Sequence, residues 1–206
     1  MEYRAVGNRC AVDIEALQLP ISHKEALNLL ASKGFSVVEV DLIALARKCI
    51  GESQYRRGAR PSEAPSVVDC SSLMKWLYGQ LGIWLPRRSI QQRELGETIQ
   101  LDEIIAGDLV FTSSWLNYYL DNPSDGVGHV GIATNDNMVI HAANKKAGVI
   151  ETPLSRFVSE TTFRGARRYI PKNREIFTLE TPTDREVESA DDIKWIVLQS
   201  LPKISF

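Results

Sequence analysis

The hydrophobic positions of the chain change their spacing several times, and each change predicts an element. Ser22 and Glu25 have the spacing of a capping box, and the apolar residues after them follow one face of a short helix that Gly34 can end. A second helix is expected over residues 40–50, whose apolar face includes Cys49. The first 50 residues are therefore predicted to be helical in part, after a strand over residues 9–14.

A third helix is predicted to begin at Cys70. Leucines recur at every fourth position from Leu73, and the helix is expected to end between Gly79 and Gly82. Asp69 is a residue type that caps helices, which places Cys70 in the first turn, where the helix dipole favours a thiolate. By itself, a cysteine among apolar residues is more often an inert core thiol.

The second half of the chain has the short apolar runs and turn residues that are typical of strands. Residues 129–134 and 138–142 are predicted to form a hairpin, because the turn residues 135–137 separate them. The other predicted strands are 109–111, 149–152 and 165–170.

The loop length of the predicted hairpin determines whether its two histidines lie on the same face. With a three-residue loop, His141 faces Gly131 and lies on the same face as His129, close enough for the two imidazoles to approach each other. A two-residue loop would place the histidines on opposite faces. Two strand histidines whose ring nitrogens bond backbone groups remain the alternative to a catalytic pair.

The composition of the chain argues against several classes of partner and location. The chain has 206 residues and a net charge of −2, with no basic run of the kind that binds nucleic acid or an anionic membrane. No apolar run approaches the ~20 residues that span a bilayer. Residues 1–20 do not resemble a secretory signal, so we expect a cytoplasmic protein unless a signal sequence has been removed.

The cysteines and histidines are few. Cys10, Cys49 and Cys70 are odd in number and widely spaced, which suggests neither a disulfide framework nor a zinc site, and we expect no metal and no cofactor. His23 lies beside serine and lysine in an exposed first turn and is interpreted as a surface residue.

At this point the chain resembles the NlpC-type cysteine peptidases, which are papain-like cell-wall peptidases of bacteria. The resemblance covers residues 41–170 and rests on several short motifs in the family's order. They are Asp69-Cys70-Ser71, Leu85-Pro86-Arg87 with Ser89 and Gln92, residues 106–111, His129-Val130-Gly131-Ile132, Ile140-His141-Ala142 and Gly165-Ala166-Arg167-Arg168.

The resemblance implies a papain-like α+β fold, with a central antiparallel sheet and the catalytic cysteine at the N-terminus of a packed helix. It implies Cys70 as nucleophile, His129 as general base and His141 as the group that orients His129. The helix start and His129 are expected to lower the pKa of the thiol, and the amide of Cys70 or Ser71 is the expected oxyanion donor.

The resemblance also implies a subsite for the free amino end of a substrate. Asp69, Ser71 and Tyr55 match its positions, and Asp69 then serves as a helix cap as well. Arg87 and Arg88 are expected to serve structure or the rim of the cleft, with a contact to a substrate carboxylate as the alternative.

The chain departs from the family pattern in three places. Ser72 replaces a glycine, Ala133 replaces a residue that is commonly aromatic, and the loop 112–127 is longer than usual. The aromatic residues of this loop are expected either to form a lid or wall of the cleft or to form a small cluster under the loop: Trp115, Tyr118 and Tyr119.

The expected organisation is an N-terminal extension over residues 1–40, a peptidase domain over 41–170 and a C-terminal extension over 171–206. The expected function is hydrolysis of an amide bond in peptidoglycan-derived peptides, after D-γ-glutamate, by a Cys-His-His triad. The expected partner is a small peptide, and the oligomeric state stays open. The alternatives are a related thiol amidase or acyltransferase, such as a toxin or effector, and a binding module without catalysis.

Overall fold

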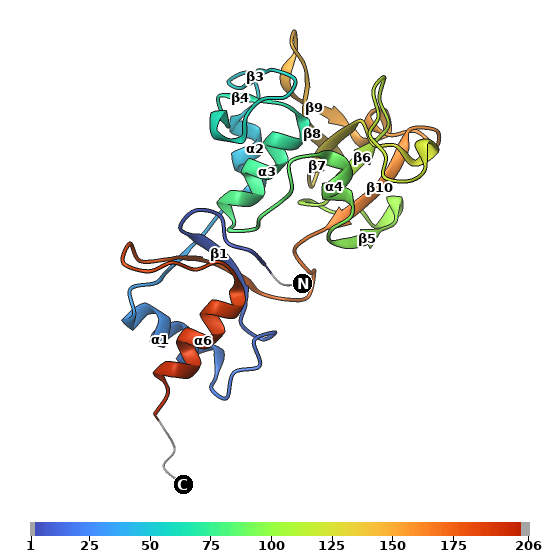
Figure 1. The fold of residues 1–206 in the computed structure, drawn as a ribbon. Helices are drawn as coiled ribbons and strands as arrows, with labels where there is room; N and C mark the ends of the chain where they lie inside the picture. The colour runs from blue at the N-terminus through green and yellow to red at the C-terminus, as the bar shows by residue number, and fades with distance from the viewer. Residues whose placement is uncertain (1–2, 203–206) are drawn as a thin grey trace. The chain divides into compact units, whose positions relative to one another are not determined.

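A computed structural model describes residues 3–202 of the protein, and the chain divides into two units. Unit 1 consists of residues 1–40, 78–84 and 171–206, and unit 2 consists of 41–77 and 85–170. Each unit has a sheet of its own, with three strands in unit 1 and six in unit 2 (Figure 1).

Unit 1 is a three-stranded antiparallel sheet with two helices. Its strands lie in the order β1 (Arg9–Asp13), β11 (Ile176–Glu180) and β2 (Ser36–Val38), and its helices are α1 (His23–Ser32) and α6 (Ala190–Ser200). The predicted capping box at the start of α1 is confirmed, because the amide of Glu25 donates to Ser22 Oγ and the amide of Ser22 donates to the Glu25 carboxylate.

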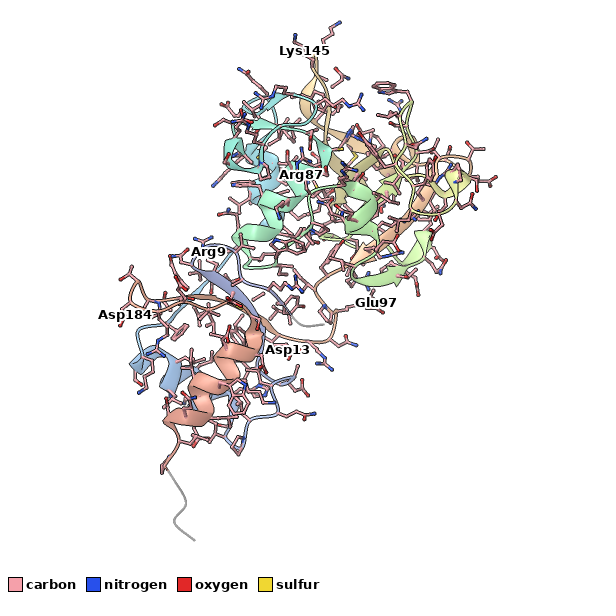
Figure 2. The ribbon with its side chains drawn as sticks, viewed as in Figure 1. Arg9, Asp13, Arg87, Glu97, Lys145 and Asp184 are labelled. Atoms are coloured by element: carbon pink, nitrogen blue, oxygen red, sulfur yellow. The ribbon has the colours of Figure 1, made fainter. Side chains whose placement is uncertain are left out.

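The polar positions of β1 are held by partners within unit 1. Arg9 Nη1 donates to the carbonyl oxygen of Gln80 over 3.0 Å. Asp13 accepts from Arg174 Nη1 over 2.8 Å, which lowers the pKa of this carboxyl (Figure 2). The charged side chains at the two ends of β1 therefore both have polar partners.

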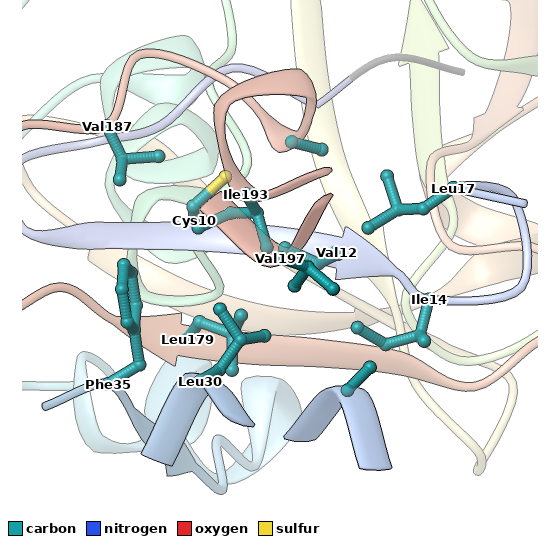
Figure 3. Close-up of a cluster of buried hydrophobic side chains, with 12 residues drawn as sticks. Cys10, Val12, Ile14, Leu17, Leu30, Phe35, Leu179, Val187, Ile193 and Val197 are labelled. Carbon is teal, nitrogen blue, oxygen red and sulfur yellow. The ribbon is translucent and has the colours of Figure 1, made fainter. Parts of the chain in front are cut away.

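The apolar positions of β1 form the core of unit 1. Cys10 and Val12 pack with Leu179 of β11 and with residues of both helices, as Figure 3 shows. Cys10 is fully buried, and burial raises the pKa of its thiol to about 12, with Asp192 adding to the effect. Cys10 is therefore a core thiol without nucleophilic character at neutral pH.

The expected organisation has two extensions, residues 1–40 and 171–206. In the structure, β11 pairs with β1 on one side and with β2 on the other, so both parts of the chain contribute to one sheet. A peptidase domain bounded at residues 41 and 170 stays a prediction.

The main sheet of unit 2 is antiparallel throughout. Its order is β5 (Glu97–Ile99), β10 (Phe163–Arg168), β6 (Leu109–Thr112), β7 (His129–Ala133), β8 (Met138–Asn144) and β9 (Gly148–Pro153). The predicted α+β class with an antiparallel sheet is confirmed.

Unit 2 also contains four α-helical segments. They are α2 (Leu42–Lys48), residues 70–77 of α3 (Cys70–Gln80), α4 (Ser89–Arg93) and α5 (Leu154–Phe157), and a short parallel pair joins β3 (Gln54–Tyr55) to β4 (Val67–Val68). The helix α3 ends at Gln80, within the predicted range. None of the helices within residues 3–202 has the length and apolar run that crossing a bilayer requires.

The hairpin of β7 and β8 has the register that brings its histidines together. Ile132 pairs with Ile140 and Ala133 with Val139, as the three-residue loop predicts. A Cβ atom at Gly131 would lie 2.4 Å from Val139 Cγ1 and 3.1 Å from His141 Cβ. Only glycine therefore allows the strands to pack this closely beside His141.

A buried ion pair joins the turn before β6 to β10. Arg168 donates to Asp108 from Nε over 2.9 Å and from Nη2 over 2.7 Å, and the amide of Ile105 donates to the same carboxylate. The two side chains are 11% and 2% exposed. The pair explains why two of the sequence motifs, far apart in the chain, contain an aspartate and an arginine at these positions.

Candidate active site

A cavity of about 780 Å³ lies in unit 2 beside the start of α3. It is lined by every residue that the sequence assigns to the site: Tyr55, Asp69, Cys70, Ser71, His129 and His141. The elements that bring them together are β3, the start of α3, and the adjacent strands β7 and β8.

The start of α3 is fixed by a reciprocal cap that positions Cys70. The amide of Ser72 donates to Asp69 Oδ1 over 2.8 Å, and the amide of Asp69 donates to Ser72 Oγ over 2.8 Å. A glycine at position 72 would lack this acceptor, so the departure from the family pattern gives the helix start a second capping bond. Cys70 then occupies the first helical position, half-buried on the cavity wall.

The two histidines are in direct contact. His129 Nε2 lies 2.8 Å from His141 Nδ1, with the rings edge to face, and His141 Nε2 lies 3.0 Å from Thr152 Oγ1 on β9. The ring of Phe157 packs against both imidazoles. His129, His141 and Thr152 thus form a continuous hydrogen-bonded chain that leads away from the cavity.

In one of its two proton arrangements, the hydrogen-bonded chain of His129, His141 and Thr152 leaves His129 able to act as a base. Thr152 Oγ1 accepts from His141 Nε2–H, which leaves His141 Nδ1 as an acceptor for His129 Nε2–H. The remaining nitrogen, His129 Nδ1, then carries a lone pair. The reverse arrangement, with the threonine hydroxyl as donor, would put a proton on that nitrogen and remove the base.

Burial governs the pKa values of the thiol and the imidazoles. It raises the pKa of Cys70 to about 11, with Asp69 adding to the rise, while the amides of Val130 and Ser71 and the charge of Arg87 lower it in part. The expectation of a lowered thiol pKa is therefore wrong, because desolvation outweighs the helix start.

Burial also lowers the pKa of His129 to about 4 and that of His141 to about 3. At neutral pH the thiol and both rings are therefore uncharged. The interaction of Cys70 with the amide of Val130, the residue after His129, places the sulfur beside the start of β7. The uncharged imidazole of His129 is therefore near the thiol and available to accept its proton.

Asp69 is held by more than its helix. Arg87 donates from Nη1 to Asp69 Oδ1 over 3.1 Å and from Nη2 to Oδ2, and the amide of Gly58 donates to Oδ2 over 3.0 Å. Arg87 Nη1 also donates to Ser71 Oγ over 2.9 Å (Arg87 is labelled in Figure 2). Arg87 therefore has the structural role that the sequence favours, and it compensates the charge of the buried Asp69.

Tyr55 belongs to the same group of residues. Its side chain is half-buried, and burial together with the nearby Cys70 and Asp69 raises the pKa of its hydroxyl. The phenol is therefore protonated at neutral pH and able to donate a hydrogen bond into the cavity.

The loop 112–127 forms part of the cavity wall. Trp115 and Tyr118 line the cavity, and Trp115 is 85% exposed, which excludes a buried aromatic cluster at that position. Tyr118 forms an antiparallel bridge with Val127. The base of the loop is held by Arg93, whose guanidinium donates to both carboxylate oxygens of Asp125 over 2.7 Å.

Thr152 is the residue that the sequence analysis misses. His141 pairs with Ile150 and Val139 pairs with Thr152, so Thr152 lies diagonally opposite His141 on the same face. The alternation of side chains along β8 and β9 could have placed Thr152 on the face of His141. An irregularity after Ala142 shifts the register near the turn, so this placement cannot be read from the sequence.

Within residues 3–202, no group of three or more histidine, cysteine, aspartate or glutamate side chains is placed to hold a metal ion.

Comparisons with known proteins identify the family. Residues 52–168 match the model of the NlpC/P60 family. The gamma-DL-glutamyl hydrolase of Bacillus subtilis (strain 168) is 30% identical over 151 residues, which cover 71% of this chain and 34% of that protein. A probable endopeptidase of Corynebacterium glutamicum is 36% identical over 125 residues, covering 61% of this chain and 48% of that protein. The chain thus spans between a third and a half of the length of these two relatives.

A solved structure shows the same fold. The crystal structure of an NlpC/P60 family protein from Bacillus cereus matches with a TM-score of 0.54 and 27% sequence identity, over 64% of this chain and 40% of that chain. The match confirms the papain-like form of the α+β fold. Since the family match extends over more than half of its residues, the chain belongs to the NlpC/P60 family of papain-like cysteine peptidases.

Proposed function

We propose that the protein hydrolyses an amide bond in peptidoglycan-derived peptides, after D-γ-glutamate, with Cys70 as nucleophile. The observation that carries the proposal is the hydrogen-bonded chain from His129 through His141 to Thr152, which ends at the cavity that Cys70 lines. This chain supplies a base and the groups that orient it, which is what nucleophilic catalysis by a thiol requires.

In the proposed reaction, Cys70 Sγ attacks the carbonyl carbon while its proton moves to His129 Nδ1. The tetrahedral oxyanion is stabilised by backbone N–H groups at the start of α3. His129 then gives the proton to the leaving amine, and the carbonyl remains on the sulfur as a thioester. A water molecule attacks the thioester while His129 takes its proton, and the bond from carbon to sulfur breaks. His129 then returns the proton to Cys70 Sγ, and the free carboxylic acid leaves.

The pKa values favour proton transfer during the attack. A thiol with a pKa of about 11 beside an imidazole with a pKa of about 4 does not form a stable thiolate–imidazolium pair in the free protein. The nucleophile is therefore generated as the substrate carbonyl is attacked, by general-base catalysis.

The nature of the substrate is inferred from the site and a relative. Asp69, Ser71 and Tyr55 line the cavity beside Cys70, where a free amino end would meet two hydroxyl groups and a carboxylate that also bonds Arg87. The name of the Bacillus subtilis relative gives it a γ-DL-glutamyl bond as its target. We infer that the same class of bond is cut here, in small peptides with a free amino end.

The proposal is tested by mass spectrometry of a defined mixture of cell-wall peptides after incubation with the protein. The wild type is expected to release fragments that end in γ-glutamate, and Cys70→Ala is expected to release none. Cys49→Ala is the matched control, because Cys49 is a buried cysteine that does not line the cavity.

Identical digests from the wild type and from Cys70→Ala would overturn the proposal. A wild type that cuts other amides or transfers acyl groups, while leaving the cell-wall peptides intact, would favour a thiol amidase or acyltransferase. Peptides acetylated at the amino end test the free-amine subsite, because they are expected to be cut at least about tenfold more slowly if an ionic contact is lost.

A further inference from the structure

The cavity has an excess of positive charge. Its charged lining consists of one carboxylate, Asp69, and three guanidinium groups, Arg57, Arg87 and Arg88. Arg87 is paired with Asp69, and the low pKa values of His129 and His141 leave both rings neutral at neutral pH. Two positive charges therefore remain uncompensated in the cavity.

Arg57 and Arg88 carry these two charges. Within residues 3–202, no carboxylate oxygen lies within 4.0 Å of either guanidinium, whereas Arg47, Arg56 and Arg93 each form an ion pair. Arginines without a carboxylate partner in a concave site are well suited to bind an anionic ligand, since their planar groups present several N–H donors.

Both guanidiniums are stacked on aromatic side chains of the loop 112–127. Arg57 lies over Trp115 at 4.8 Å from the ring centre, and Arg88 lies over Tyr118 at 5.4 Å. Arg57 Nη2 also lies 3.4 Å from the hydroxyl oxygen of Tyr118. Stacking occupies the face of a guanidinium and leaves the N–H groups in its plane available to a ligand.

The loop that carries the aromatic residues is held in place. The bridge between Tyr118 and Val127 has two backbone hydrogen bonds, of 2.9 and 2.8 Å. A Cβ atom at Gly128 would lie 2.5 Å from atoms of Leu116 and Asn117, so the loop packs tightly onto the start of β7. The backbone that carries the two aromatic residues is therefore held in place.

We propose that Arg57 and Arg88, supported by Trp115 and Tyr118, form a carboxylate-binding subsite that makes the enzyme selective for acidic peptides. The subsite rests on the proposed function, because it would bind a free carboxylate of the peptide whose amide bond Cys70 attacks. A peptide with a carboxamide in place of that carboxylate would lose the charge-assisted hydrogen bonds and would be a poorer substrate.

The charge of the subsite is tested without any substrate. Iodoacetate and iodoacetamide alkylate the same sulfur and differ by one carboxylate, so the ratio of their rates at Cys70 reports the local potential. Peptide mass spectrometry separates Cys70 from Cys10 and Cys49, and the same ratio in the urea-unfolded chain at equal ionic strength is the reference. The thiolate fraction cancels in each ratio.

We expect the ratio of iodoacetate to iodoacetamide rates in the native protein to exceed the unfolded reference by about tenfold, the lower end of what a charged cleft gives. Arg57→Gln and Arg88→Gln are each expected to lower it by about threefold. Arg56→Gln is the matched control, because Arg56 adjoins Arg57 in the chain but is paired with Glu63 and does not line the cavity. A native ratio equal to the reference, or an equal loss in Arg56→Gln, would overturn the subsite.

Hydrolysis then tests selectivity. The value of kcat/KM is compared for γ-glutamyl peptides with a free carboxylate and for the same peptides with a carboxamide. The wild type is expected to prefer the acid at least about tenfold, and Arg57→Gln with Arg88→Gln is expected to abolish the preference, mainly through KM. An acid preference that persists in this double variant would overturn the assignment to these arginines. Failure of the wild type to cut either peptide would overturn the proposed function, while the alkylation ratios would still decide the charge of the subsite.

Discussion

Thr152 offers the sharpest test of the hydrogen-bonded chain at the site. Its Oγ1 lies 3.0 Å from His141 Nε2 and is the acceptor that leaves His129 Nδ1 free of a proton. Thr152→Val keeps the shape of the side chain and removes the hydroxyl. The buried His141 then has an N–H group without an acceptor, and the arrangement in which His129 is a base loses its advantage.

The magnitude follows from that single hydrogen bond. Leaving a buried donor unsatisfied costs about 1–3 kcal/mol, and about 1.4 kcal/mol corresponds to a tenfold change. The fraction of molecules with a basic His129, and with it kcat, is therefore expected to fall by roughly fivefold to 150-fold. KM is expected to change little, because Thr152 does not line the cavity.

The assay is steady-state hydrolysis of the cell-wall peptide that the wild type cuts best, with the unfolding midpoint in urea measured alongside. Thr152→Ser is the control, since it restores the hydroxyl and is expected to keep kcat within about threefold of the wild type. Wild-type kcat in Thr152→Val would refute the role of Thr152. An equal loss in both variants would also contradict this role, because Thr152→Ser keeps the hydroxyl and loses only the methyl group.

Two further predictions concern pH and stability. The pKa of Cys70 is raised to about 11 and that of His129 is lowered to about 4, so the uncharged pair predominates between these two pH values. The value of kcat/KM is therefore expected to stay level from about pH 5 to about pH 9. Below pH 5 it is expected to fall, because His129 takes up a proton. Arg168→Met leaves the buried Asp108 without its partner and is expected to lower the free energy of unfolding in urea by about 3–5 kcal/mol.

Each of these has an outcome that contradicts it. Two ionisations between pH 6 and pH 8 in the profile of kcat/KM would indicate a preformed ion pair of thiolate and imidazolium. For the stability prediction, Asp108→Leu with Arg168→Met is the control, since it removes both charges and is expected to recover much of the loss. A single Arg168→Met variant as stable as the wild type would show that the pair is not buried in solution.

Local signals carry most of what the sequence predicts at the site. The helix start at Asp69 and the odd loop of the β7–β8 hairpin depend on neighbouring residues, and both are confirmed. The pKa of Cys70 depends instead on how much of the chain covers it, and this tertiary property reverses the expected direction. The same limit explains why the pairing of β11 with β1 and β2 is not foreseen, because its partners are remote in the sequence.

The order of strands in unit 1 has a consequence for the way the protein is made. The central strand, β11, is synthesised long after its two neighbours, β1 and β2, so the three-stranded sheet cannot close until residues 176–180 have left the ribosome. The strands β7, β8 and β9 pair through short connections and need no such wait. Until β11 arrives, β1 presents its apolar face and an unpaired edge, which is the period in which a chaperone has most to protect.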